Sequence, residues 1–154
     1  MRDLAPKRAA ILEKWLEQTL ATYPSQTAGF LRNEKDRFRN PVGSTLKEGL
    51  ATLLDEITGE MDMAKIRPAM ESIVRMRAVQ DFTAAQATSF VFVLRQILNE
   101  SWDGASPAAW QTRIDQLALL AFDLYTKCRE EIYEINARQH QRGMYLWERM
   151  SRKE

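Results

Sequence analysis

Residues 108–142 read AAWQTRIDQLALLAFDLYTKCREEIYEINARQHQR, and no proline or glycine interrupts them. Ser106-Pro107 stands directly before this stretch, and a capping serine followed by a proline at the first helical position favours a helix start. As an α-helix, residues 107–142 would extend about 54 Å, which is longer than a domain of this size needs. We therefore expect one long C-terminal helix, residues 107–150, that projects from the rest of the chain.

The upstream part of the chain is also predicted to be helical, because its prolines and glycines fall between segments of helical apolar periodicity. Asn40-Pro41 is a strong helix start, and Gly59 is suited to end that helix. Thr83 and Gln86 form a capping-box pair. A fourth helix is expected to begin near Arg67, because Pro68 favours the first turn of a helix. The other expected helices cover residues 11–23, 25–32, 40–59, 83–104 and 107–150. The fold class is therefore all-α, with six to seven helices in a single domain, residues 1–154.

Composition excludes several classes of function. The 154 residues carry 22 Lys and Arg against 21 Asp and Glu, a formal net charge of +1, which lacks the excess of positive charge typical of a nucleic-acid-binding domain. The longest apolar run, 117–122, is far shorter than the roughly 18 residues of a membrane helix, and the first ten residues lack the apolar centre of a signal peptide. A single cysteine excludes intrachain disulfides and multi-cysteine metal sites. We expect a cytoplasmic chain with no membrane insertion, nucleic-acid partner, metal or cofactor.

Residue types that commonly carry catalysis are scarce. His140 is the only histidine and lies in a polar run, residues 138–142, so an exposed position is expected. Without a second histidine, every Ser-His-Asp or Cys-His arrangement would depend on this one residue. Cys128 lies at helical spacing with apolar neighbours and is expected to be a small core or interface residue. No catalytic residue is predicted.

One local basic cluster precedes the helix that starts at Asn40. It consists of Arg32, Lys35, Arg37 and Arg39. Arginines beside a helix N-terminus suit an anion. Glu34 and Asp36 interleave with them, and the alternative is a surface loop with local ion pairs.

Two further arginines, Arg75 and Arg77, lie at the end of a predicted helix. They suit the negative end of the helix dipole, or they pair with Asp36 or Asp81 and hold the loop at residues 37–43. The sequence leaves both interpretations open. The candidate anion or partner site therefore comprises Arg37, Arg39, Asn40, Arg75 and Arg77.

Two stretches of the sequence resemble a known family. They are Arg37-Phe38-Arg39-Asn40-Pro41-Val42-Gly43 and Arg75-Met76-Arg77-Ala78-Val79-Gln80-Asp81-Phe82-Thr83. With the pattern from Trp15 to Phe30 and with Gln86-Ala87 and Phe90, they resemble the RsbRD N-terminal domain family, the sensor-like domain of the RsbT co-antagonist proteins of bacterial stressosomes. The resemblance covers residues 11–131, and the first stretch is the more specific of the two.

This resemblance implies a helical signal-input domain with a globin-like fold that binds no haem and forms dimers. In the related proteins the last helix leads to a C-terminal STAS domain that carries the phosphorylated residues. The sequence stops at Glu154, so we expect no STAS domain and no direct phospho-relay. The family assigns no catalytic residues, and its two motifs are expected to mark structural joints. The expected function is a non-enzymatic sensory or regulatory domain that contacts an unidentified regulatory protein. The alternatives are a small-molecule-binding protein with an interior or dimer-interface pocket and, more remotely, an enzyme.

The long helix is also the expected site of homodimer formation. Apolar side chains recur along it at spacings of three and four residues, and some of them are expected to serve the protein's own core. The tail beyond Gly143 adds a further apolar cluster, residues 144–150. In the alternative, Gly143 ends the helix and the tail folds back on its own domain. The predicted interface comprises Ile114, Leu117, Ala121, Leu124, Cys128, Ile132, Ile135 and Trp147.

Overall fold

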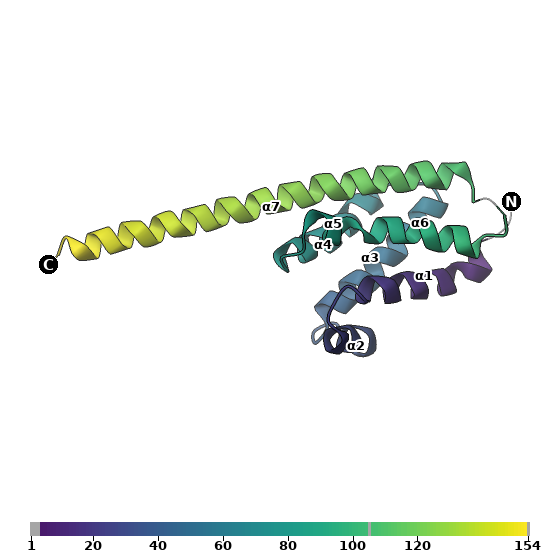
Figure 1. Ribbon diagram of the computed structural model, residues 1–154, viewed down its shortest axis with the longest axis horizontal. Coiled ribbons are helices and arrows are strands. Elements are labelled where there is room, and N and C mark those ends of the chain that lie inside the picture. The colour runs from purple at the N-terminus through teal and green to yellow at the C-terminus, as the bar shows by residue number, and fades with distance from the viewer. Residues whose placement is uncertain (1–3, 105, 154) are drawn as a thin grey trace.

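The computed structural model of the chain describes residues 4–104 and 106–153, and within these ranges it is all-α with no strand. Seven helices follow one another: α1 (Ala5–Leu20), α2 (Ser25–Asn33), α3 (Pro41–Thr58), α4 (Met63–Val79), α5 (Ala84–Thr88), α6 (Phe90–Ser101) and α7 (Ala108–Ser151). Helices α1 to α6 lie on one side of the first part of α7, and the second part of α7 extends away from them to the C-terminus (Figure 1). The all-α prediction with a long last helix is confirmed; the globin-like arrangement stays a prediction.

The core of the helical body forms where α3 packs on α4, α4 on α7, and α1 on α6. Trp15 of α1 is fully buried, and its indole nitrogen donates a hydrogen bond of 2.7 Å to the Phe90 carbonyl of α6. The buried face of α3 consists of Leu46, Leu50, Leu53, Leu54 and Ile57. These apolar faces account for the association of the helices, because burying one Leu or Ile side chain contributes roughly 1.5–3 kcal/mol.

The predicted helix signals at three positions are confirmed. Asn40 caps α3 by accepting the Gly43 N–H at 2.8 Å, with Pro41 in the first turn. Gly59 ends α3. The Thr83–Gln86 capping box opens α5, with both of its hydrogen bonds formed.

The predicted start of α4 near Arg67 is wrong. The helix begins at Met63, because the Asp62 side chain caps it by accepting the Ala64 N–H at 2.9 Å. Pro68 lies inside the helix, and a proline there leaves the Ala64 carbonyl without its usual N–H donor. Both residues are exposed, so water can satisfy that carbonyl.

The predicted single helix over residues 83–104 is also corrected. The chain forms α5 and α6, separated at Ser89, and α6 ends at Ser101. The Arg77 side chain bonds to the Gln86 carbonyl at 3.0 Å, and this carbonyl would accept from the Phe90 N–H in an uninterrupted helix. A side chain inserted at this point accounts for the break.

The N-terminus of α7 differs slightly from the prediction. The helix begins at Ala108, and the Ser106 hydroxyl donates to the Asn99 side chain at 2.7 Å instead of capping α7. At the other end the helix continues through Gly143 to Ser151, so the alternative in which the tail folds back is wrong. With 44 residues, α7 is about 66 Å long.

Candidate functional site

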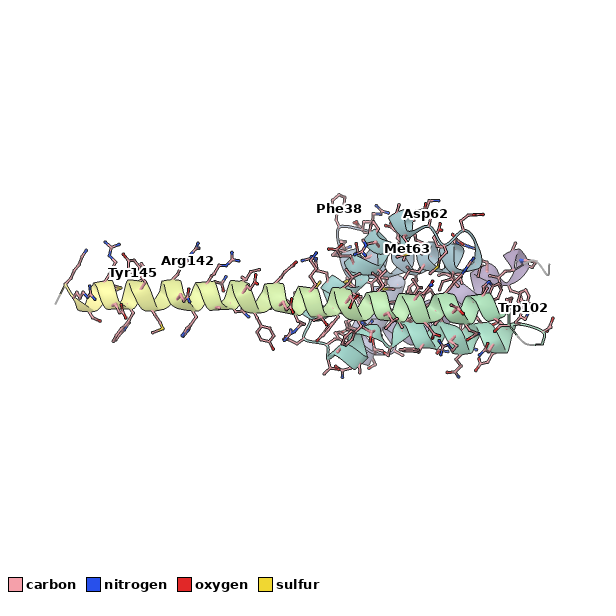
Figure 2. All side chains as sticks on the ribbon, turned by 90° about the horizontal axis from the view of Figure 1, so that it is seen from above. Phe38, Asp62, Met63, Trp102, Arg142 and Tyr145 are labelled. Carbon is pink, nitrogen blue, oxygen red and sulfur yellow. The ribbon has the colours of Figure 1, made fainter. Side chains whose placement is uncertain are left out.

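The second part of α7 is the most exposed regular element of the described chain. Cys128 is the last buried residue of the helix, and every residue from Tyr133 to Lys153 is exposed. Tyr145 and Arg142 lie on this section, far from the helical body (Figure 2). A helix without tertiary contacts is marginal in water. This section also exposes large apolar side chains, among them Tyr133, Trp147 and Met150, which the described body of the protein does not cover.

A seam of residues, all exposed except Arg129, runs along α7 from Leu119 to Met150. Its positions are alternately three and four residues apart, the heptad spacing of a helix that packs on another helix. The large apolar residues on the seam are between 55% and 72% exposed. They are Leu119, Phe122, Tyr133, Trp147 and Met150. The remaining seam positions are Thr126, Asn136, His140 and Gly143, which are exposed, and Arg129, which is half-buried.

This seam differs from the predicted interface stripe. Of the predicted interface residues, Ile114, Leu117, Ala121, Leu124 and Cys128 are buried in the body of the protein itself. Ile132 is half-buried, whereas Ile135 and Trp147 are exposed. Phe122 follows the buried Ala121 directly and so lies about 100° round the helix from it. Trp147 is the one predicted interface residue that lies on the seam. The rest of the seam was not predicted, because the buried stripe has the more continuous apolar spacing; the 3-4 spacing of Leu119, Phe122 and Tyr133 was the available signal.

The helix is fixed to the body just before it becomes exposed. The Tyr125 hydroxyl donates to the Phe82 carbonyl at 2.6 Å, and Arg129 donates to the Ala78 carbonyl at 3.3 Å. Arg129 also forms an ion pair of 3.7 Å with Asp81, which adopts a positive φ of 62°. All of these contacts join α7 to the end of α4 and to the α4–α5 loop. This loop is therefore the joint between the body and the projecting helix.

Arg77, in the second family-like stretch, lies fully buried behind this joint. Its guanidinium donates to the Thr22 hydroxyl and to the Gln86 carbonyl, both at 3.0 Å. The rings of Tyr23, Phe82 and Phe90 surround it at 4.5–5.8 Å from its Cζ. Burial lowers the pKa of Arg77. Burial raises the pKa of Tyr23, and the positive charge of Arg77 partly offsets that rise. Arg77 thus ties the α1–α2 connection to α4 and α5.

Asp36 and Asp81, the predicted acidic partners of Arg75 and Arg77, pair with neither arginine. Asp36 accepts the Phe38 N–H at 2.9 Å, and Asp81 pairs with Arg129. Arg75 instead bonds to Glu71 and to Glu131 of α7, each at 3.1 Å, and these carboxylates raise its pKa. The prediction that the second stretch forms a structural joint agrees with these contacts.

The first family-like stretch forms a second joint, between α2 and α3. Besides capping α3, the Asn40 side chain donates to the Leu31 and Glu34 carbonyls at 2.9 and 3.1 Å. Gly43 is required here because a Cβ would lie 2.2 Å from the Asn40 amide nitrogen and 2.6 Å from the Leu31 carbonyl oxygen. Asn40 is buried, and the backbone closes tightly around it.

The predicted anion site does not form one cluster of free cations. Arg37 pairs with Glu48, and Arg39 lies 3.9 Å from Glu34, so the alternative of a surface loop with local ion pairs describes this region. Arg75 and Arg77 have their own partners near the joint at the α4–α5 loop.

Groups suited to covalent or metal chemistry are few within residues 4–104 and 106–153. His140 is exposed on the projecting section of α7, as expected. Cys128 is buried, and burial raises the pKa of its thiol, which disfavours the reactive thiolate. In this part of the chain no three His, Cys, Asp or Glu side chains are placed to hold a metal ion, and no helix is long and apolar enough to cross a membrane.

The family model described as the RsbT co-antagonist protein rsbRD N-terminal domain matches residues 9–140, which include both joints and α7 as far as His140. No curated protein and no solved structure matches the chain.

Proposed function

The chain belongs to the family of RsbT co-antagonist protein RsbRD N-terminal domains, and from this membership we propose that it is a non-enzymatic sensory and regulatory domain. It acts through protein–protein contacts and forms a homodimer along α7. A cytoplasmic location belongs to the same proposal, and the single cysteine of the chain supports it.

The observation that carries this proposal is the exposed seam from Leu119 to Met150. Burying a side chain such as Met or Phe contributes roughly 1.5–3 kcal/mol, so a seam with five large apolar residues favours association with another helix. The 3-4 spacing fits a partner helix of the same geometry, and a second copy of α7 offers one at equal concentration. Asn136 and His140 lie on the seam between its apolar residues. In a helix pair they favour one alignment of the two helices over shifted ones, as buried polar residues do in coiled coils.

The joint at the α4–α5 loop supports a regulatory role. It holds the α1–α2 connection, the loop itself and the base of α7 in one network, through Arg77, Tyr125 and Arg129. A change in the body at this network would alter the direction or stability of the projecting helix. Coupling of this kind needs an element that can adopt two arrangements. The projecting helix is such an element, because an unpaired helix is only marginally stable and can be either folded or frayed.

Light scattering at micromolar concentration tests the proposal. Wild-type protein is expected to have about twice the chain mass of 17.8 kDa. Trp147→Glu places a charge on the seam and is expected to give monomers. The matched control is Tyr145→Glu, because Tyr145 is also apolar and exposed but lies off the seam, on the opposite side of the helix.

Two results would contradict the proposed pairing. One is a wild-type protein that stays monomeric over a wide concentration range; co-purification from the native host would then show whether the seam binds a different helical protein. The other is equal loss of pairing in Trp147→Glu and Tyr145→Glu, which would mean that the tail associates through general apolarity and not through the seam.

A further inference from the structure

A cavity of about 590 Å³ lies at the end of the protein opposite to the projecting tail. It forms where α1 begins, α3 ends and α7 begins, and Trp102 marks this end of the molecule (Figure 2). Its volume falls within the range of small-molecule sites, which are about 300–1,000 Å³. Sequence analysis missed it, because its walls come from residues far apart in the chain.

Two tryptophans form the apolar wall of this cavity. Trp102 follows α6 and Trp110 lies in the first turn of α7, and their ring centroids are 4.9 Å apart at an interplanar angle of 73°. Both are half-buried, so part of each ring stays accessible. Leu4 and Pro107 extend the same wall. A flat aromatic or apolar molecule can pack against such a wall, as tryptophans do with other rings.

Two arginines supply the charge of the cavity, and they differ in their partners. Arg8 forms a bidentate pair with the Asp55 carboxylate, which neutralises it. Arg113 donates from one nitrogen, Nη1, to the Ile57 and Gly59 carbonyls at 2.7 and 2.8 Å. Those acceptors are backbone carbonyls at the end of α3, so they fix the guanidinium without cancelling its charge. A fixed arginine beside an apolar wall selects a ligand with one negatively charged group.

We propose that this cavity binds a flat aromatic monocarboxylate, with its ring against Trp102 and Trp110 and its carboxylate on the Arg113 guanidinium. The site lies on the first turns of α7, the helix that carries the seam at its other end. The binding itself is independent of the proposed pairing.

The indole N–H signals of the four tryptophans provide the test in a ¹⁵N-labelled sample. Trp15 lies in the core, Trp102 and Trp110 line the cavity, and Trp147 lies on the tail. The probe is 2-naphthoate, and the neutral probe of the same shape is 2-naphthamide. Titration with 2-naphthoate is expected to shift the Trp102 and Trp110 signals and leave Trp15 and Trp147 in place. 2-Naphthamide is expected to bind at least tenfold more weakly.

Variants separate the charge from the wall. Arg113→Gln keeps a donor for the α3 carbonyls but removes the charge, and it is expected to remove the preference for 2-naphthoate over 2-naphthamide. Arg138→Gln, on the projecting section of α7, is the matched control and should preserve that preference. An unshifted Trp15 signal shows that each variant is folded, and Trp147→Glu should bind 2-naphthoate as wild type does, whatever its oligomeric state.

Several outcomes would overturn the inference. If wild-type protein binds 2-naphthoate and 2-naphthamide with equal affinity, the carboxylate is not recognised, and Arg113 does not have the proposed role. This result needs no variant. No shift at millimolar 2-naphthoate, or shifts at Trp147 in place of Trp102 and Trp110, would show that the cavity does not bind this class of molecule.

Discussion

The Arg77 guanidinium lies against the Phe82 ring, with 4.5 Å between its Cζ and the ring centroid. Arg77 comes from the last turn of α4 and Phe82 from the loop that follows, so this contact folds the loop back over the end of the helix. The Phe82 carbonyl accepts the Tyr125 hydroxyl of α7 at 2.6 Å. The Phe82 ring thus meets the buried cation, and the Phe82 carbonyl meets the base of the projecting helix.

Substitutions of Arg77 test whether its stacking or its charge stabilises this joint. Two guanidinium nitrogens, Nε and Nη1, are buried without a hydrogen-bond partner, so the charge is incompletely solvated by the protein. Lys is more strongly hydrated and cannot stack in the same way, and Arg77→Lys is expected to lower the free energy of unfolding by about 1–3 kcal/mol. Arg77→Met removes the buried charge and is expected to cost less than Arg77→Lys. Urea unfolding measures both; a tolerated Lys with a disruptive Met would show that the charge itself is required.

The other joint depends on both ends of the Asn40 amide. Its oxygen caps α3, whereas its nitrogen donates to the Leu31 and Glu34 carbonyls. Asn40→Ala removes both functions, and loss of the cap alone costs about 0.5–2 kcal/mol. Asn40→Asp keeps a capping oxygen, but it replaces the amide group that donates to the two carbonyls with an oxygen that cannot donate. Thermal unfolding is therefore expected to show a loss of about 1 kcal/mol or more in the free energy of unfolding. If Asn40→Asp is as stable as wild type, Asn40 acts only as a cap.

How much of this architecture the sequence predicts depends on whether a signal is local. The N-cap Asn40, the Thr83–Gln86 capping box and the helix-ending Gly59 act through neighbouring residues, and each is confirmed. The wrong start of α4 shows the limit, because Asp62 has a short-range capping role that the strong signal of Pro68 concealed. The break at Ser89 comes from Arg77, whose bond to Gln86 is a tertiary contact and has no local signature.

Functional surfaces were predicted less well, for a related reason. Helical periodicity identifies an apolar stripe but does not say which part of it the protein itself covers. The buried stripe from Ile114 to Cys128 and the exposed seam from Leu119 to Met150 lie on the same helix, and only the packing of α3, α4, α5 and α6 on α7 separates them. The Trp102–Trp110 wall and Arg113 join three chain segments, so their proximity appears only in the folded protein.

The buried thiol of Cys128 gives the protein a predictable response to alkaline pH. Burial raises the pKa of this thiol above its ordinary value of about 8.5, so the folded chain keeps a proton that the unfolded chain loses. The stabilisation is complete below the pKa of the unfolded thiol and decreases as pH rises toward the folded pKa. Urea unfolding between pH 7.5 and 9.5 should show a decline of up to about 1.4 kcal/mol per pH unit, and this slope should be smaller in Cys128→Ala. Equal slopes in the two proteins would assign the decline to other groups.

Gly143 is the least helix-favouring residue of the projecting section, and its replacement tests how that section is stabilised. A Cβ at Gly143 would meet no heavy atom within 4 Å, and glycine inside a helix costs about 0.8–1.0 kcal/mol relative to alanine. Gly143→Ala is therefore expected to increase helicity by circular dichroism and to slow amide hydrogen exchange across residues 133–151. Gly29→Ala is the control, because Gly29 of α2 also has open space around it and lies outside α7.

The concentration dependence of the same exchange rates separates a helix that is stable alone from one that pairing stabilises. An unpaired helix of this length opens readily, whereas helix pairing buries its seam and links opening to dissociation. Exchange across residues 133–151 is expected to accelerate on dilution in the wild type and to be fast at all concentrations in Trp147→Glu. In Gly143→Ala the acceleration should begin at a lower concentration, because a more stable helix pairs more readily. If Gly143→Ala gains helicity but pairs more weakly, the helices approach each other closely at Gly143, and the glycine serves the interface itself.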